Sequence, residues 1–334
     1  MKILVTGGAG YIGSHCCIEL LGSGQDVVVV DNFSNSNPEA LENIGRIAGR
    51  AFDFVEADLR DEAAMDRIFA EHSIGAVIHF AGLKAVGESV EMPLEYYDNN
   101  LGGSLSLFKA MRRHAVKKIV FSSSATVYGM HNPMPLKEDY PTSAVNPYGY
   151  TKVVIERMLQ DIAAANPDWS VCLLRYFNPI GAHESGLLGE EPNGTPNNLL
   201  PYIAMVAAGK MDFLRVFGDD YDTVDGTGVR DYIHVLDLAS GHLAALDYLA
   251  GHSGAIPINL GTGKGTSVLQ MIRAFEKASG KPIPYRIEGR RAGDIAECYA
   301  DVARAKALLG WQAVRSIEQM CEDGWRFVRR RSLG

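Results

Sequence analysis

A glycine-rich turn stands at the very start of this chain, and it constrains the fold more than any other feature. The letters TGGAGYIG (residues 6–13) follow the apolar run 3–5 and lead into a helix-like stretch. Gly7, Gly10 and Gly13 form a GxxGxxG variant of the dinucleotide fingerprint. In that fingerprint glycines permit a tight turn and a close backbone approach to a pyrophosphate, and the helix N-terminus offers N–H groups. The strand–turn–helix context favours a dinucleotide site over a plain turn.

The first half of the chain alternates short apolar runs with helix-like patterns. This alternation predicts βαβ units, and so a Rossmann-type α/β fold: a doubly wound parallel sheet with helices on both faces. We expect buried strands at 3–5, 27–30, 52–55, 76–80, 119–121 and 171–174, and helices near 11–22, 38–48, 61–71, 93–113 and 147–165.

After residue 178 the pattern changes. Residues 179–200 are rich in Gly, Pro, Asn and Glu and predict a long irregular loop of the kind that is usually functional. We expect an NAD-binding domain over 1–178 and a smaller mixed α/β substrate domain over 179–334, with 230–261 returning to the first sheet. Helices are predicted in this half near 199–208, 236–250, 266–279, 301–309 and 316–330.

Charge and cysteine content exclude several classes of protein. The 334 residues carry a net charge of −8, which disfavours a nucleic-acid-binding protein. The five cysteines are odd in number and form no CxxC pair, as is typical of reduced thiols in a cytoplasmic protein rather than of a disulfide framework or a metal site. We expect neither a signal peptide nor a membrane span, because the first apolar run is short and interrupted by glycines and no segment reaches the length of a span.

Asp31 ends the second predicted strand, 18 residues after Gly13. A carboxylate there accepts hydrogen bonds from a ribose 2′-OH and repels a 2′-phosphate, which favours NAD over NADP, although a strand-end cap remains an equal alternative. Asp58 follows the third strand, near the expected adenine, and residues 80–84 follow the fourth, along the cofactor path.

The stretch NPYGYTK (146–152) predicts an acid/base pair. Asn146 and Pro147 suit a helix start, and Tyr148 shares a helix face with Lys152, whereas Tyr150 does not. A nearby ammonium and a nicotinamide cation favour the phenolate, and lowering a tyrosine pKa by ~3 units requires about 4 kcal/mol. The alternative is a surface tyrosine beside a solvated lysine.

A serine run at the end of the fifth strand supplies a third polar group. The letters FSSSATVYG (121–129) place Ser122, Ser123 and Ser124 at the ligand-binding rim, where a hydroxyl donates to a developing carbonyl oxygen. Periodicity does not choose among the three, and serines also cap turns.

Together these segments resemble the UDP-glucose (UDP-galactose) 4-epimerase family of the extended short-chain dehydrogenase/reductase superfamily. The likeness covers residues 2 to about 310 and rests on TGGAGYIGSH, DN at 31–32, HFAGLKAVGES, SSSATVYG, YGYTK, LRYFNPIGAH, PNNLLPYI, GTGVRDYIHV and RRAGD. The resemblance implies a retained NAD⁺ and UDP-hexose substrates. It also implies that Tyr148 takes the 4-hydroxyl proton, that Lys152 tunes Tyr148, and that Ser124 holds the 4-oxygen.

The resemblance assigns further residues to cofactor and substrate. Beyond the three glycines, the implied cofactor contacts are Tyr11, Ile12, Asp31, Asn32, Asp58, Leu59, Phe80, Ala81, Gly82, Lys84, Asn99, Ser124, Tyr148, Lys152 and Phe177. The implied substrate contacts are Lys84, Ser124, Tyr148, Asn178, Asn198, Leu199, Phe217, Arg230, Tyr232, Arg291, Asp294 and Cys298.

Residue chemistry agrees with a nucleotide-sugar site in the second half. Pro196–Asn198 open a predicted helix whose N-terminus suits a diphosphate. Arg230 and Arg291 suit bidentate phosphate contacts, with surface ion pairs as the alternative. Phe217 suits packing on uracil, with core packing about equally favoured. Asp294 suits ribose hydroxyls.

Related reactions in the superfamily need additional carboxylates. Nucleotide-sugar 4,6-dehydratases resemble this chain but carry an Asp-Glu pair where it has Ala125 and Thr126, and UDP-glucuronate decarboxylases carry a glutamate at the second position. Epimerisation needs neither. A non-catalytic NAD-binding sensor is disfavoured because tyrosine, lysine and serine are all present.

Two further expectations concern substrate range and assembly. Cys298 falls where a bulky tyrosine restricts the family's sugar pocket, so we expect a roomier pocket that also accepts UDP-GlcNAc and UDP-GalNAc, unless Tyr299 fills the space. The family resemblance implies a homodimer that pairs through helices 93–113 and 147–165.

Overall fold

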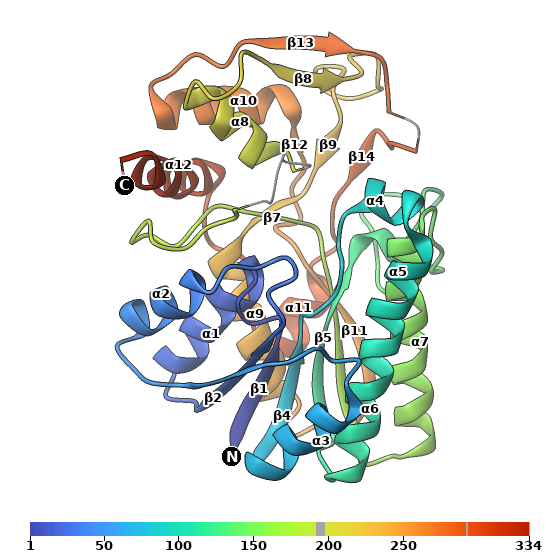
Figure 1. Ribbon diagram of the computed structural model, residues 1–334. Coiled ribbons are helices and arrows are strands. Elements are labelled where there is room, and N and C mark those ends of the chain that lie inside the picture. Colours follow the sequence, from blue (N-terminus) through green and yellow to red (C-terminus); the bar gives the residue numbers. More distant parts are fainter. Residues whose placement is uncertain (192–197, 292, 334) are drawn as a thin grey trace.

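The computed structural model describes residues 1–191, 198–291 and 293–333. Its centre is a seven-stranded, all-parallel sheet with the strand order β11-β6-β5-β4-β1-β2-β3 (Figure 1). The order reverses between β1 and β4, and ligands of such sheets bind outside the carboxyl ends of the strands at this point. The strands are β1 (Lys2–Thr6), β2 (Val27–Asp31), β3 (Asp53–Glu56), β4 (Ile74–His79), β5 (Lys118–Ser124), β6 (Ser170–Tyr176) and β11 (Gly254–Leu260).

Helices cover both faces of the sheet and create two separate cores. Successive strand residues point to opposite faces, so Leu4 packs in one core and its neighbour Val5 in the other. One face is covered by α1 (Tyr11–Gly22), α2 (Glu39–Ala48), α9 (Val235–Tyr248) and α11 (Ala303–Leu309), and the other by α3 (Glu62–Glu71), α6 (Gly103–Arg113) and α7 (Pro147–Ala165) (Figure 1). The predicted fold class is confirmed.

Four local features differ from the predictions. The strand predicted as buried at 52–55 is half-buried, because β3 lies at the edge of the sheet and has one neighbour. The single helix predicted at 93–113 is α5 (Pro93–Tyr97), a π-helical turn (Asp98–Gly102) and then α6. A short helix, α4 (Val86–Glu91), was not predicted, and the loop expected at 179–200 begins with a strand, β7 (Asn178–Ile180).

The smaller domain stacks above the carboxyl ends of the sheet strands (Figure 1). It has its own core, built around Ile203, Phe275 and Met320. Its helices are α8 (Leu199–Ala207), α10 (Val268–Ser279) and α12 (Ile317–Leu333). Its strands form three small sheets: β7 with β10 (Tyr232–His234), β8 (Leu214–Phe217) with β13 (Tyr285–Glu288), and β9 (Val229–Arg230) with β12 (Thr266–Ser267) and β14 (Glu297–Cys298). Helix α10 begins at Val268, two residues later than predicted, because Ser267 and Gln270 form a capping box.

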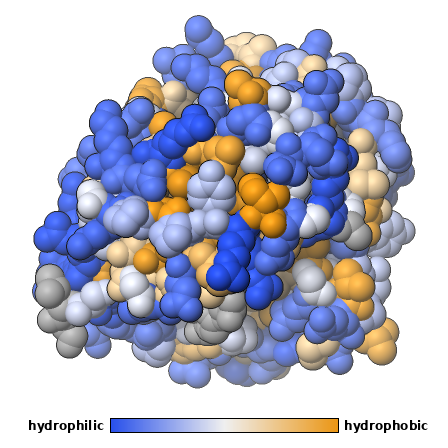
Figure 2. All heavy atoms as spheres, turned by 90° about the horizontal axis from the view of Figure 1, so that it is seen from above, coloured by the Kyte–Doolittle hydropathy of each residue, from blue (hydrophilic) through white to orange (hydrophobic). Residues whose placement is uncertain are grey.

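The outer face of the smaller domain is largely hydrophilic, with apolar residues near its middle (Figure 2). Tyr285 and Ile287 of β13 are among the exposed apolar side chains of the protein. None of the helices in the described part of the chain combines the length and the apolar composition that a membrane crossing requires.

Candidate active site

The glycine loop forms a cradle at the carboxyl end of β1. Gly7 has φ +69°, and a Cβ atom there would lie 2.7 Å from the backbone nitrogen of Ala81. A Cβ on Gly13 would lie 2.2 Å from the carbonyl oxygen of Gly7. Gly10 is the N-cap of α1 and makes no side-chain cap bond, so the first N–H groups of the helix face the rim. A cradle that two Cβ atoms would destroy fits a dinucleotide pyrophosphate.

Asp31 lies beside this loop, at the end of β2. Its carboxylate accepts hydrogen bonds from the backbone N–H groups of Ala9 and Phe33, both at 3.0 Å, and from the Ser36 hydroxyl at 2.7 Å. Asp31 can therefore both cap the end of its strand and accept hydrogen bonds from a ribose. The bonds that cap the strand also hold the carboxylate at the rim of the sheet.

A polar cluster continues from Asp31 along the rim. Asn32 donates to Asp58 at 3.1 Å, and Arg60 binds the same carboxylate. Hydrogen bonding to Arg60 is the main reason why the pKa of Asp58 falls to about 2. The structure therefore brings Asp31, Asn32 and Asp58 together at the expected adenosine end.

The loop after β4 is held by a residue that the sequence did not reveal. The Asn100 side chain accepts from the Leu83 N–H at 2.8 Å and donates to the Leu83 carbonyl at 3.0 Å. Asn100 lies in the π-helical turn beside the predicted contact Asn99, and this explains why the helix is interrupted there. The turn thereby fixes the cofactor-side segment that carries Phe80, Ala81, Gly82 and Lys84.

The Tyr–Lys pair begins α7. The Asn146 side chain accepts from the Gly149 N–H at 2.8 Å and caps the helix, as the sequence predicts. Tyr150 is 52% exposed and packs against the Tyr97 ring, whereas Tyr148 turns inward. The buried Lys152 places its Nζ 5.9 Å from the centre of the Tyr148 ring.

Burial sets the ionisation of this pair. It lowers the pKa of Lys152 to about 8, and the carboxylate of Glu156 opposes that change. Burial also raises the pKa of Tyr148, and hydrogen bonding with the Ser124 side chain lowers it. A bound nicotinamide cation would favour the Tyr148 phenolate further.

The three serines of β5 have three different partners. Ser122 Oγ bonds with the Tyr176 hydroxyl, and Ser123 Oγ donates to Glu156 at 2.5 Å. Ser124 is half-buried at the strand end, its Oγ accepts from the Thr126 N–H at 3.2 Å, and its side chain lowers the pKa of Tyr148. Ser124 is therefore the serine that influences Tyr148.

The predicted substrate residues gather above the sheet in two groups. Arg230 on β9 is paired in register with Cys298 on β14, and its Nη2 lies 3.5 Å from Asp294. The guanidinium of Arg291 lies 3.8 Å from the centre of the Phe217 ring. Of the other predicted substrate residues, Tyr232 is buried and Asn178 begins β7, directly after the predicted cofactor contact Phe177, which is also buried.

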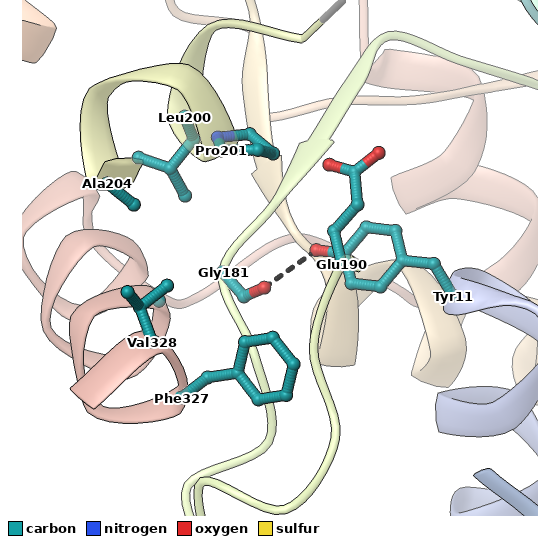
Figure 3. A pocket seen from close by; sticks show the side chains of 9 residues that line it. Tyr11, Gly181, Glu190, Leu200, Pro201, Ala204, Phe327 and Val328 are labelled. Atoms are coloured by element: carbon teal, nitrogen blue, oxygen red, sulfur yellow. Dashed lines mark hydrogen bonds between the residues drawn. The ribbon is translucent and has the colours of Figure 1, made fainter. Parts of the chain in front are cut away.

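Two acidic residues in this region were not predicted. Glu190 accepts from Lys84 at 3.1 Å and from Asn198, the N-cap of α8, at 2.6 Å, and so joins a predicted cofactor contact to a predicted substrate contact. It lines a small pocket with Tyr11, whose hydroxyl donates to Gly181 O at 2.8 Å (Figure 3). Positions 196 and 197 of the predicted helix start lie outside the described residues.

Asp231 is the second of these acidic residues, and it is fully buried. Its carboxylate accepts from Thr262 N and Oγ1 at 2.8 and 2.6 Å, from Gly263 N at 3.0 Å and from Ala300 N at 3.2 Å. Its backbone carbonyl accepts from Asn178 N at 3.0 Å. Asp231 thus ties the loop after β11, the chain after β14 and the start of β7 to one point beside Arg230.

Comparisons with known proteins agree with this geometry. Residues 3–261 match the model of the NAD dependent epimerase/dehydratase family. The chain is 61% identical to the UDP-glucose 4-epimerase of Bacillus subtilis (strain 168), over 98% of this chain and 96% of that one, and 55% identical to that of Bos taurus, over 100% and 98%.

Solved structures superpose over almost the whole chain. The UDP-glucose 4-epimerase of Stenotrophomonas maltophila, with bound NAD and formylated UDP-arabinopyranose, gives a TM-score of 0.98 at 53% identity and covers 100% of this chain and 99% of its own. That of Bifidobacterium longum, in complex with NAD⁺ and UDP, gives 0.96 at 55% identity, with 99% of both chains covered. The chain belongs to the NAD-dependent epimerase/dehydratase family.

Proposed function

We propose that this protein is a UDP-glucose 4-epimerase, which interconverts UDP-glucose and UDP-galactose with NAD as a retained cofactor. The observation that carries the proposal is the placement of Tyr148, Lys152 and Ser124 at the carboxyl ends of the strands that also carry the glycine cradle. Ala125 and Thr126, which follow Ser124, add no carboxylate for dehydration or decarboxylation. The full-length similarity to UDP-glucose 4-epimerases supports the same activity.

The side chains divide the work at the sugar C4 position. NAD⁺ held by the glycine cradle and Asp31 would supply the acceptor for the C4 hydride and its donor for the return to the other face of the sugar. Tyr148 takes the proton from the 4-hydroxyl and gives it back, Lys152 stabilises the phenolate, and Ser124 bonds the 4-oxygen. Arg230 and Arg291 hold the diphosphate of the substrate. The sugar can therefore rotate and present its other face to the cofactor while its nucleotide stays bound.

The test is to supply UDP-glucose, UDP-galactose, UDP-GlcNAc and UDP-GalNAc separately and to measure the products by NMR. UDP-glucose and UDP-galactose should each yield the other. UDP-glucuronate and UDP-pentoses are supplied in parallel, and turnover confined to them, or a dehydrated product, would contradict the proposal. A protein that binds NAD but converts none of the sugars would instead be a non-catalytic NAD-binding sensor.

We further propose that the N-acetylated pair is also interconverted. Cys298 packs in the small apolar cluster that contains Ala125 and Phe177, next to the serine and cofactor contacts. The Tyr299 ring lies instead near Gly265, 3.7 Å from the position that a Cβ there would take. This placement supports a sugar pocket that a tyrosine side chain does not fill.

A homodimer is proposed on the basis of apolar exposure. Val90, Leu94 and Leu105 are exposed on α4, α5 and α6, and Tyr150 is exposed on the adjoining α7. A second copy of this chain would cover these side chains by pairing helices. Light scattering after size exclusion should give twice the chain mass, and replacing both leucines by glutamate should give the monomer mass.

We also propose how the chain divides into domains and where in the cell the protein is located. We place the NAD-binding domain at 1–178 and the substrate domain at 179–334, with 230–261 returning to the sheet. Strand β11 pairs with β6, and α9 packs on the same face as α1, which supports that return. The five cysteines are all free thiols, which supports a cytoplasmic location.

A further inference from the structure

Helix α7 carries a third ionisable side chain in line with the acid/base pair. Tyr148, Lys152 and Glu156 are four residues apart and so lie along one helix face. Glu156 is buried, with 3% of its surface exposed. Two of these side chains bind successive residues at the end of β5: Lys152 Nζ donates to the Ser122 carbonyl at 2.7 Å, and Glu156 accepts from Ser123 Oγ at 2.5 Å. The next residue, Ser124, lowers the pKa of Tyr148 through its side chain.

A buried arginine completes this arrangement. Arg175 on β6 is the register partner of Ser123, and both side chains reach Glu156. Arg175 donates from Nε to Glu156 Oε1 at 2.9 Å and from Nη2 to Oε2 at 2.6 Å, and its Nη1 donates to the Glu138 carbonyl at 3.1 Å. Burying two charges costs desolvation free energy that such a pair does not reliably recover, so a buried ion pair next to an active site suggests a functional role.

We propose that Glu156 is a positioning residue for the epimerisation: it keeps Lys152 protonated and holds the Ser122–Ser124 strand end against α7. The inference rests on the proposed function, because Lys152 matters only if Tyr148 acts as acid and base. Arg175 binds both carboxylate oxygens of Glu156 and so fixes the position of that side chain.

The groups around Lys152 support an electrostatic role. It faces Tyr148 and Glu156 on its own helix, the Phe121 ring and Ser122 carbonyl on β5, and His79 on β4. Tyr176 on β6 bonds with the side chain of Ser122. Burial, and secondarily the charge of Lys152, lowers the pKa of His79 to about 3, so His79 is neutral near pH 7.

Tyr176 is also neutral near pH 7, because burial raises its pKa. Among these described neighbours, the Glu156 carboxylate raises the pKa of Lys152 against the effect of burial.

The test compares Glu156→Gln with Glu156→Asp in the NAD-bound protein. The epimerisation rate is measured from pH 6 to pH 10, with saturating UDP-galactose. We expect the alkaline fall in rate to move to lower pH by on the order of one unit or more in Glu156→Gln, because Lys152 loses its proton sooner. Glu156→Asp keeps the charge and should keep the wild-type position of this fall, even if the rate is lower.

The outcomes separate this inference from the proposed function. An inactive wild type with NAD bound would contradict the proposed function itself. An active wild type, with a Glu156→Gln variant that is less stable but has an unchanged pH profile, would overturn the inference and make Glu156 a structural residue.

If Glu156→Gln does not fold, Glu156→Gln/Arg175→Met removes both charges and leaves no unpaired charge in the core. The alkaline fall should move in the same direction in that variant, and an unchanged position would overturn the inference.

Discussion

Lys152 Nζ lies 5.9 Å from the centre of the Tyr148 ring and donates a hydrogen bond to the Ser122 carbonyl at 2.7 Å. The bond to Ser122 fixes the ammonium beside the tyrosine, and no carboxylate of the described residues forms an ion pair with it. The positive charge therefore remains available to the Tyr148 phenolate. This relationship leads to the first two predictions.

Replacing Tyr148 by phenylalanine should reduce the epimerisation rate by about 10²- to 10⁴-fold, because the proton at the sugar 4-oxygen loses its acceptor. NAD should stay bound, which the absorbance of the purified protein checks. Tyr150→Phe is the matched control: that side chain is half-exposed against Tyr97, and the rate should stay within about twofold. If Tyr150→Phe reduced the epimerisation rate more than Tyr148→Phe, Tyr150 rather than Tyr148 would be the residue that takes the proton.

Replacing Lys152 by methionine should stabilise the protein freed of NAD at pH 7 by about 1–3 kcal/mol, while activity is lost. Burial lowers the folded-state pKa to about 8, below the ordinary value of 10.5. Between these values the unfolded chain binds a proton that the folded protein does not, so the wild type gains stability as the pH rises from about 8 to 10.5.

Denaturant unfolding at pH 7 and pH 10.5 measures this difference. The advantage of the Lys152→Met variant should be largest below pH 8 and should disappear near pH 10.5. An advantage that does not change with pH would show that the lysine charge is not its cause.

Replacing Asp231 by asparagine should raise the KM for UDP-galactose by about tenfold, because an amide cannot accept from all the N–H groups that converge on this carboxylate. Arg230 and Cys298 would lose their common anchor, whereas bound NAD should be retained. Asp220→Asn is the control, since Asp220 pairs with Arg290 at the surface and should leave KM unchanged. A loss of NAD with an unchanged KM would contradict the assigned role.

Replacing Cys298 by tyrosine should abolish turnover of UDP-GlcNAc and UDP-GalNAc while turnover of the glucose pair continues, because the larger ring takes the space of the N-acetyl group. Cys298→Ala keeps the space and should keep both activities. Product ratios for all four sugars, measured by NMR, decide the question. A wild type that never converts UDP-GlcNAc would refute the prediction.

Features that depend on neighbours in the sequence could be predicted, whereas those that depend on distant partners could not. Apolar runs located the strands, and the four-residue spacing selected Tyr148 over Tyr150. The choice of Ser124 required the pairing of β5 with β6, which places Ser123 beside Arg175. Sequence spacing contains no information on that register.

The remaining errors have the same physical origin. Phe52–Val55 has the composition of a buried strand, but its exposure depends on its place at the sheet edge. Glu190 reaches Lys84 across 106 residues, and Asp231 reaches Ala300 across 69, so no local pattern marks either one. Glu156 is the exception, because its four-residue spacing from Lys152 was visible in the sequence.

A labelled substrate follows the hydride itself. UDP-galactose that carries deuterium at C4 is converted in ordinary water, and the UDP-glucose formed is analysed by NMR and mass spectrometry. The deuterium should remain at C4, because a hydride held by bound NAD would return to the sugar without exchange with solvent. Deuterium replaced by solvent hydrogen would contradict the hydride mechanism, because it would indicate inversion by proton exchange at carbon.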